Sequence, residues 1–89
     1  MNTDSILAEA ENIINGSRNA DYGDVVANFK RISEIAETTF GISINPVEVC
    51  QVLLAVKLAR EAYLHKRDNL VDLCGYAEIL NRLHESEQQ

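Results

Sequence analysis

The sequence predicts an all-α fold, either a four-helix bundle or a pair of helical hairpins. Apolar residues recur at the three- and four-residue spacing of a helix in four segments, and residues that start or stop helices flank these segments. No stretch of useful length shows the alternation that is typical of a strand. We therefore expect one helical domain over residues 1–89, ending in a polar tail at about residues 85–89.

Two helices are expected in the first half of the chain. The first covers about residues 4–15, where apolar residues recur at helical spacing until Gly16 offers a stop. Asp24 can cap the second helix, which continues to about residue 39 and ends before Gly41. Each of these helices has one apolar stripe and needs a neighbour to cover it.

The third expected helix has the clearest start. Asn45 serves as the N-cap, Pro46 takes the first position, where its missing N–H costs nothing, and Glu48 completes a capping box. A broad apolar face then continues to Tyr63, so this helix is expected to be central in the fold. After a short polar turn, Asp68 is expected to cap the fourth helix.

Composition and charge narrow the class of partner. Hydrophobic residues make up 46% of the chain, although a chain this small buries only about 60–65% of its unfolded surface. The apolar surplus predicts an oligomer, with a homodimer as the default, and a monomer with ordinary exposed apolar surface is the alternative. The net charge of −6, from 14 acidic and 8 basic side chains, disfavours binding to duplex nucleic acid.

Cysteine usage and hydropathy predict a cytoplasmic protein. Cys50 and Cys74 fall at apolar helical positions, which favours free thiols in a reducing compartment over a disulfide. These cysteines and the two histidines lack the spacing of a zinc site. The N-terminus has no signal-peptide pattern, and Lys57 and Arg60 interrupt the longest apolar runs, so no membrane-spanning helix is expected.

The most informative polar residues lie on the last two helices. Lys57 and Arg60 share one face of the third helix, and Asp68, Asp72 and Tyr76 share one face of the fourth. The short connection makes these helices antiparallel neighbours, so the five side chains should gather along one edge of the hairpin.

Two interpretations of this edge stay open. If the hairpin folds about residues 66–67, Arg60 comes within reach of Asp72, and an interhelical salt bridge explains the cluster. Alternatively, Lys57 and Arg60 hold phosphate oxygens while Asp68 and Asp72 bind Mg²⁺, which prefers oxygen ligands and often binds through carboxylates and substrate phosphates. In that case Tyr76 or Tyr22 would stack on the base of a nucleotide.

A second polar segment precedes the second helix. Arg18 and Tyr22 are its candidate ligand contacts, because an aromatic residue next to Gly23 in a loop that opens a helix can stack on a base or bring backbone N–H groups to an anion. The alternative is an ordinary turn in which Tyr22 covers the core and Gly23 takes a positive φ.

These motifs together resemble a family of small phage and prophage proteins that has no established activity, which would place the chain in the cytoplasm of a host bacterium. The resemblance covers about residues 18–80. It is carried by Tyr22-Gly23, Asn28-Phe29-x-x-Ile32, Pro46, Lys57-Leu58-Ala59-Arg60 and Asp68-Asn69-Leu70-Val71-Asp72-Leu73-Cys74-Gly75-Tyr76-Ala77.

More distantly, the layout is similar to the all-α nucleotide pyrophosphohydrolases of the MazG kind. That resemblance implies Mg²⁺ held by two acidic pairs and release of pyrophosphate from a nucleoside triphosphate. Glu34 and Glu37 match the first pair, as less favoured metal ligands than Asp68 and Asp72. The second pair falls at Asn69 and Asp72, where asparagine replaces one acid and weakens divalent-ion binding.

Three functional hypotheses follow. The first is a phage-type accessory protein that binds a nucleotide or another phosphate-bearing ligand, with weak or lost pyrophosphohydrolase activity. The second is a non-enzymatic helical interaction module that binds a host protein or sequesters a nucleotide signal. The third is a structural module in which the charged edge is only a salt-bridge network. Whether the chain is an enzyme stays open.

Overall fold

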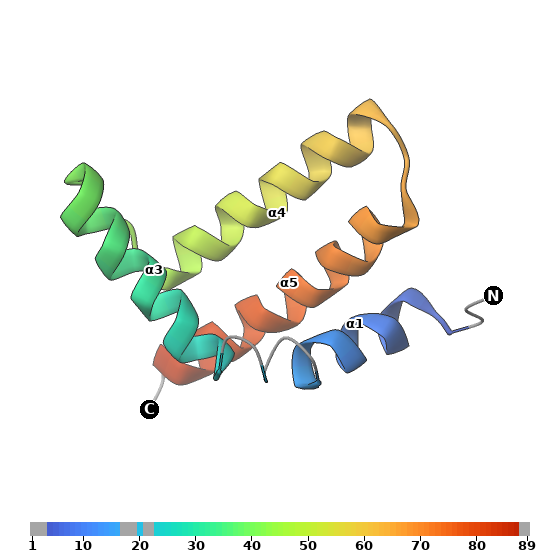
Figure 1. The fold of residues 1–89 in the computed structure, drawn as a ribbon, viewed down its shortest axis with the longest axis horizontal. Helices are drawn as coiled ribbons and strands as arrows, with labels where there is room; N and C mark the ends of the chain where they lie inside the picture. Colours follow the sequence, from blue (N-terminus) through green and yellow to red (C-terminus); the bar gives the residue numbers. More distant parts are fainter. Residues whose placement is uncertain (1–3, 17–19, 21–22, 88–89) are drawn as a thin grey trace.

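The computed structural model describes residues 4–16, 20 and 23–87. Within these residues the chain forms four helices and no strand: α1 (Ile6–Asn15), α3 (Val25–Phe40), α4 (Pro46–Tyr63) and α5 (Arg67–Glu87). The predicted all-α class is therefore confirmed. Figure 1 shows the hairpin of α4 and α5, with α1 alongside α5 and α3 crossing near the start of α4.

The caps that the sequence predicts for its second and third helices are present in α3 and α4. The Asp24 side chain accepts a hydrogen bond from the backbone N–H of Ala27 at 3.0 Å, and Gly41 ends α3 in the left-handed conformation at φ 67°. At the start of α4, Asn45 accepts from the Glu48 N–H at 2.8 Å, and the Glu48 carboxylate accepts from the Asn45 N–H at 3.1 Å. This reciprocal pair satisfies two backbone donors that the first turn of a helix leaves free.

The start of α5 differs from the prediction. Asp68 does not cap this helix, because α5 begins at Arg67 and Asp68 lies inside its first turn. The preceding helix stops at Tyr63, where Leu64 turns to an extended conformation at φ −154° and ψ 120°. The turn therefore consists of residues 64–66, and its centre lies earlier in the chain than the sequence suggested.

The central helix is α5, not α4 as predicted. It packs against α1, α3 and α4, and its buried residues are spread along its whole length. The core combines residues from all four helices: Ile14, Phe29, Val47, Val49, Cys50, Ile79 and Leu83. On α4 the buried residues are confined to the first five positions, because α3 and α4 diverge beyond the point where they cross (Figure 1).

Both cysteines are free thiols, as predicted. The Cys50 thiol is fully buried and donates a hydrogen bond to the backbone oxygen of Tyr76 at 3.3 Å, which ties α4 to α5. Burial raises the pKa of the Cys50 thiol from 9.0 to about 11, because the thiolate would lose its hydration. Among the helices described, none is long and apolar enough to cross a bilayer.

Candidate functional site: the α4–α5 turn and the outer face of α4

An ion pair joins the two helices of the hairpin. The Lys57 Nζ lies 2.5 Å from Asp72 Oδ2, and their side chains are only 14% and 22% exposed. The sequence had instead paired Asp72 with Arg60. The earlier end of α4 moves the centre of the turn back along the chain, and this shift brings Lys57 rather than Arg60 opposite Asp72.

A second network closes the turn itself. The Glu61 carboxylate accepts hydrogen bonds from the Asn69 side-chain amide at 3.2 Å and from the Lys66 backbone N–H at 3.0 Å, and it also pairs with His65. The His65 contact is the main reason why the pKa of Glu61 is lowered, followed by the Lys66 N–H. Asn69 is buried and also reaches the Leu64 carbonyl at 3.5 Å.

Sequence reasoning missed this network. It had read Asn69 as the replacement of a metal-binding acid, whereas in the structure the amide fixes the geometry of the turn. The signal was nevertheless in the sequence. A carboxylate in the last turn of a helix, followed after a tight connection by an amide in the first turn of the next helix, places the two within reach.

Arg60 lies outside both networks. No ion pair or side-chain hydrogen bond involves it in the described part of the chain, and its side chain is exposed. It borders a groove of about 580 Å³ beside the turn. The groove is lined by Lys57, Ala59, Arg60, Tyr63, Leu64, Lys66, Asp68 and Asn69. Its two exposed cations, Arg60 and Lys66, outnumber its one exposed carboxylate, so it can attract an anion.

The four carboxylates predicted to bind magnesium lie in different surroundings. Asp72 is engaged by Lys57, and Asp68 is exposed at the groove. Glu34 and Glu37 are both exposed on α3. Within residues 4–16, 20 and 23–87, no three histidine, cysteine or acidic side chains come close enough together to hold a metal ion. Because Mg²⁺ requires several oxygen ligands in near-octahedral geometry, its binding stays a prediction without structural support.

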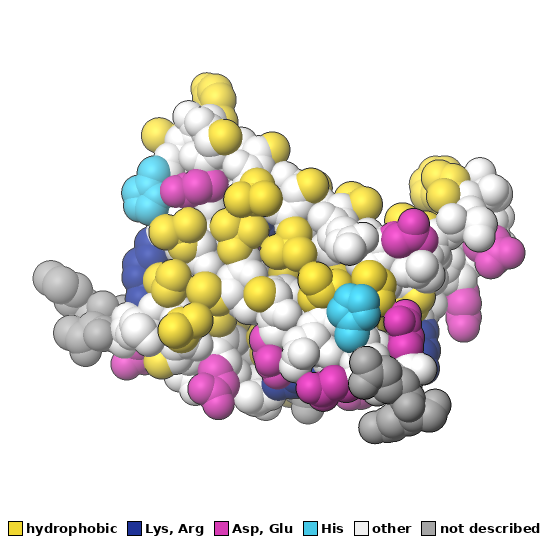
Figure 2. All heavy atoms as spheres, turned by 180° about the vertical axis from the view of Figure 1, so that it is seen from behind, with side chains coloured by type: hydrophobic (Ala, Val, Ile, Leu, Met, Phe, Trp, Pro, Cys, Tyr) yellow, Lys and Arg dark blue, Asp and Glu magenta, His cyan; other side chains and the backbone are white. Residues whose placement is uncertain are grey.

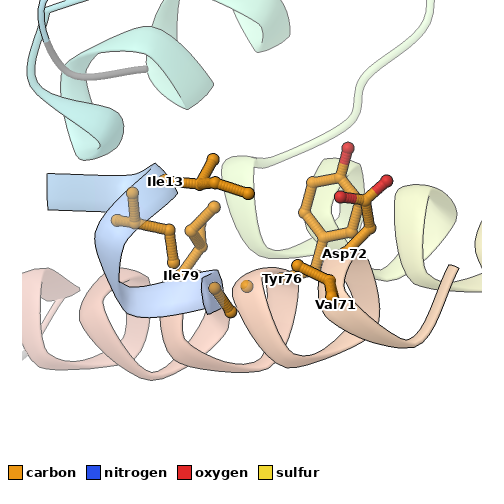
Figure 3. A pocket seen from close by; sticks show the side chains of 8 residues that line it. Ile13, Val71, Asp72, Tyr76 and Ile79 are labelled. Carbon is orange, nitrogen blue, oxygen red and sulfur yellow. The ribbon is translucent and has the colours of Figure 1, made fainter. Parts of the chain in front are cut away.

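Tyr76 lies away from the groove. It is half-buried against the core and, with Asp72, lines a cavity of only about 20 Å³ between α1 and α5. Figure 3 shows both side chains on α5 with Ile13 of α1 nearby. A cavity of this size has room for about one water molecule but not for a base. The other predicted contacts, Arg18 and Tyr22, lie outside the described residues.

Gly75 of α5 faces Ile14 of α1 beside this cavity. A Cβ atom at Gly75 would lie 3.5 Å from the Ile14 Cδ1, which is already van der Waals contact. The close approach of α1 and α5 thus gives this mid-helix glycine a packing context.

The outer face of α4 carries an unusual apolar stripe. We define the α4 stripe as Val52, Val56, Ala59 and Tyr63, which recur at spacings of four, three and four residues. The stripe continues from Val49, which is 7% exposed, but the exposed fraction rises to 53% at Val52, 37% at Val56 and 92% at Tyr63. Figure 2 shows hydrophobic side chains gathered over the α4–α5 hairpin.

Comparison with known proteins gives family-level matches. Residues 5–84 match the family described as Domain of unknown function (DUF6378). The chain is 38% identical over 88 residues to the Gene 55 protein of Mycobacterium phage L5, an alignment that covers 96% of this chain and 56% of that protein. It is 33% identical over 84 residues to the Gene 55 protein of Mycobacterium phage D29, with coverage of 93% and 56%.

The chain thus spans about half the length of these curated relatives. No solved structure matches it. The expected resemblance to a small phage protein family is confirmed, because both relatives are phage proteins. The more distant similarity to MazG-type pyrophosphohydrolases stays a prediction.

Proposed function

Since the chain belongs to the DUF6378 family of phage-related proteins, we propose that it is an accessory protein that acts by protein–protein association rather than by chemistry. Its binding surface is the α4 stripe. This corresponds to the interaction-module hypothesis, and the observation that carries it is the exposure of Val52, Val56 and Tyr63 along one continuous apolar face.

The polarity of α4 supports this proposal. A surface helix of a monomer normally buries its apolar side and presents charges to water. Beyond its first turns α4 does the opposite: Lys57 and Glu61 lie toward α5 in the networks described above, whereas Val56 and Tyr63 lie in solvent. A contiguous exposed apolar face on a soluble domain is typical of an interaction surface.

The contacts of two acidic residues in the described hairpin support it as well. Asp72 neutralises Lys57, and Glu61 is held by three groups of the turn. Such contacts stabilise the hairpin and engage Asp72 and Glu61 in structural roles, so that neither carboxylate is free to position a metal or activate a water molecule.

Site-specific photocrosslinking in the bacterial cytoplasm tests the proposal. A photoreactive amino acid at Val56 should give a discrete covalent adduct, whose mass distinguishes a second copy of the chain from another protein. Leu7 on α1 is a matched control, because it is also apolar and exposed but lies off the stripe. Absence of an adduct at Val56 in soluble, folded protein, or equal adducts at both positions, would contradict the proposal.

A second candidate function is supported by the groove at the turn. Its volume of about 580 Å³ falls in the range of roughly 300–1,000 Å³ that is usual for small-molecule sites. Arg60 and Lys66 would contact the phosphate oxygens of a nucleotide or a related ligand, and Tyr63 would lie beside its base. Nothing in this arrangement requires Mg²⁺.

The melting temperature measured with nucleoside mono- and triphosphates and cyclic dinucleotides, with and without Mg²⁺, tests this candidate. A ligand at 100 times its Kd should stabilise the fold by about 2.7 kcal/mol. Arg60→Gln should abolish the shift, while Lys30→Gln, on the exposed surface of α3, should keep it. A Mg²⁺-dependent shift with triphosphates, accompanied by released pyrophosphate, would instead support the hydrolase hypothesis. No shift with any ligand would contradict phosphate binding.

A further inference from the structure

We propose that the partner on the α4 stripe is a second copy of the chain, in a two-fold dimer whose α4 helices pack antiparallel. The inference rests on the proposed association function and specifies which molecule binds the α4 stripe. It is carried by the surface area of the chain, the spacing of the stripe and the distribution of charge along α4.

The chain exposes more surface than a compact domain of its size. Its accessible surface is 6082 Å², against roughly 5,200 Å² for a compact monomer of 9.9 kDa. The excess of about 900 Å² is close to the roughly 800 Å² that each partner buries in a standard protein interface. The radius of gyration agrees, at 13.9 Å against about 12 Å for a compact domain of this length.

Exposed apolar side chains follow two helices that diverge. Along α3, Phe29 is buried in the core that it shares with α4, whereas Phe40 at the end of α3 is exposed. Along α4 the same change occurs between Val49 and Val52. Figure 1 shows the two helices diverging beyond their crossing, so the exposed apolar residues further along each helix lack a neighbouring helix within one copy.

The α4 stripe is suited to pack against itself. Its spacing of four, three and four residues is the repeat that keeps one seam facing a partner helix. No charged residue lies on it, and Ala59 leaves room for close approach of the two backbones. In a two-fold interface both subunits contribute the same patch, so one self-complementary apolar seam buries the exposed stripe of each subunit.

Charge at the two ends of α4 favours the antiparallel direction. Glu48 lies in the first turn of α4, and Arg60 lies near its C-terminal end. An antiparallel pair centred near residue 54 brings the acidic first turn of one α4 to the level of the basic last turn of the partner's α4, once at each end of the seam. A parallel pair would instead align the two acidic ends with each other and the two basic ends with each other, which is less favourable.

Sedimentation of the purified protein over a wide concentration range tests the dimer. The expected result is a reversible species of twice 9.9 kDa. Val56→Glu should raise the dimer Kd at least about 30-fold, because each dimer would bury two unpaired carboxylates. Leu7→Glu should leave the Kd unchanged. Circular dichroism should confirm that both variants fold, and Ala59→Arg is a second disruptive variant on the stripe.

Disulfide trapping tests the direction of packing. In a Cys74→Ser background, Ala55→Cys lies close to the proposed axis and should form a covalent dimer on oxidation, whereas Ala62→Cys should not. Both positions are exposed on α4. Trapping at both positions, or at Ala62→Cys alone, would overturn the antiparallel arrangement.

A protein that stays monomeric at every concentration would overturn the dimer. The photocrosslinking experiment then separates the two proposals. An adduct of another mass at Val56 would leave association through the stripe standing with a different partner. Absence of any adduct would remove the proposed function as well.

Discussion

Helices α4 and α5 form one hairpin, yet they use their apolar residues in opposite ways. The buried residues of α5 recur from Asn69 to Leu83, so that helix is held along its length by its three neighbours. The buried residues of α4 end at Cys50, and its later apolar positions are exposed apart from the half-buried Leu53 and Leu54. The difference shows that an apolar stripe indicates which side of a helix seeks cover, while neighbouring elements decide whether cover is present.

The largest expected effect separates the buried helix from the exposed one. Ile79→Ala on α5, which removes a fully buried side chain, should lower the free energy of unfolding by about 2–4 kcal/mol through lost burial and a new cavity. Leu58→Ala on α4 removes an exposed side chain off the stripe and should cost less than about 1 kcal/mol. Urea unfolding of the two variants measures both values, and equal losses would refute the contrast.

The buried thiol of Cys50, near the start of α4, should make the free energy of unfolding depend on pH in alkaline solution. The pKa of Cys50 is raised to about 11 in the folded state, so between pH 9 and pH 11 the unfolded chain loses this proton while the folded chain keeps it. Stability should therefore fall as the pH rises through this window, by roughly 2–3 kcal/mol from this thiol. Chemical unfolding of the wild type and of Cys50→Ala at pH 8 and pH 11 isolates this contribution, which the variant should lack.

The ion pair between the helices should contribute less. Asp72→Asn leaves the Lys57 ammonium without its partner in a largely buried position, and the expected loss is about 1–2 kcal/mol, reduced from the fully buried case by partial solvation. Arg60→Gln is the matched control and should leave stability nearly unchanged, since this exposed cation takes part in neither network. Thermal and urea unfolding report both effects. A larger loss at Arg60 would restore the pairing that the sequence suggested.

The smallest effect concerns backbone propensity. Gly75→Ala should stabilise the protein by about 0.5–1 kcal/mol, because alanine favours the helix and its Cβ would only touch Ile14. Ala55→Gly on the exposed side of α4 should destabilise by a similar amount. If Gly75→Ala instead lowers the melting temperature, α1 packs against α5 more tightly than the 3.5 Å separation implies.

Most features that depend on residues close together in the sequence were predicted correctly, whereas several that depend on distant residues were not. The capping box of Asn45 and Glu48 depends on residues within three positions, and it was predicted correctly. The partner of Asp72 depends on where α4 ends. Because Leu64 is extended, α4 ends earlier than expected, and Asp72 pairs with Lys57 instead of Arg60. The candidate site changed accordingly: Arg60 stayed available at the groove, whereas Lys57 and Asp72 neutralise each other.

The sequence by itself determined the four helices, the caps of α3 and α4, and the family, because these depend on neighbours along the chain and on residue identity. Only the tertiary structure decided that α5 is central and that Asn69 holds the turn. It also decided that the stripe from Val52 to Tyr63 is left uncovered. The physical reason is that burial depends on the area that other elements remove from water, and helical periodicity defines a face without naming what packs against it.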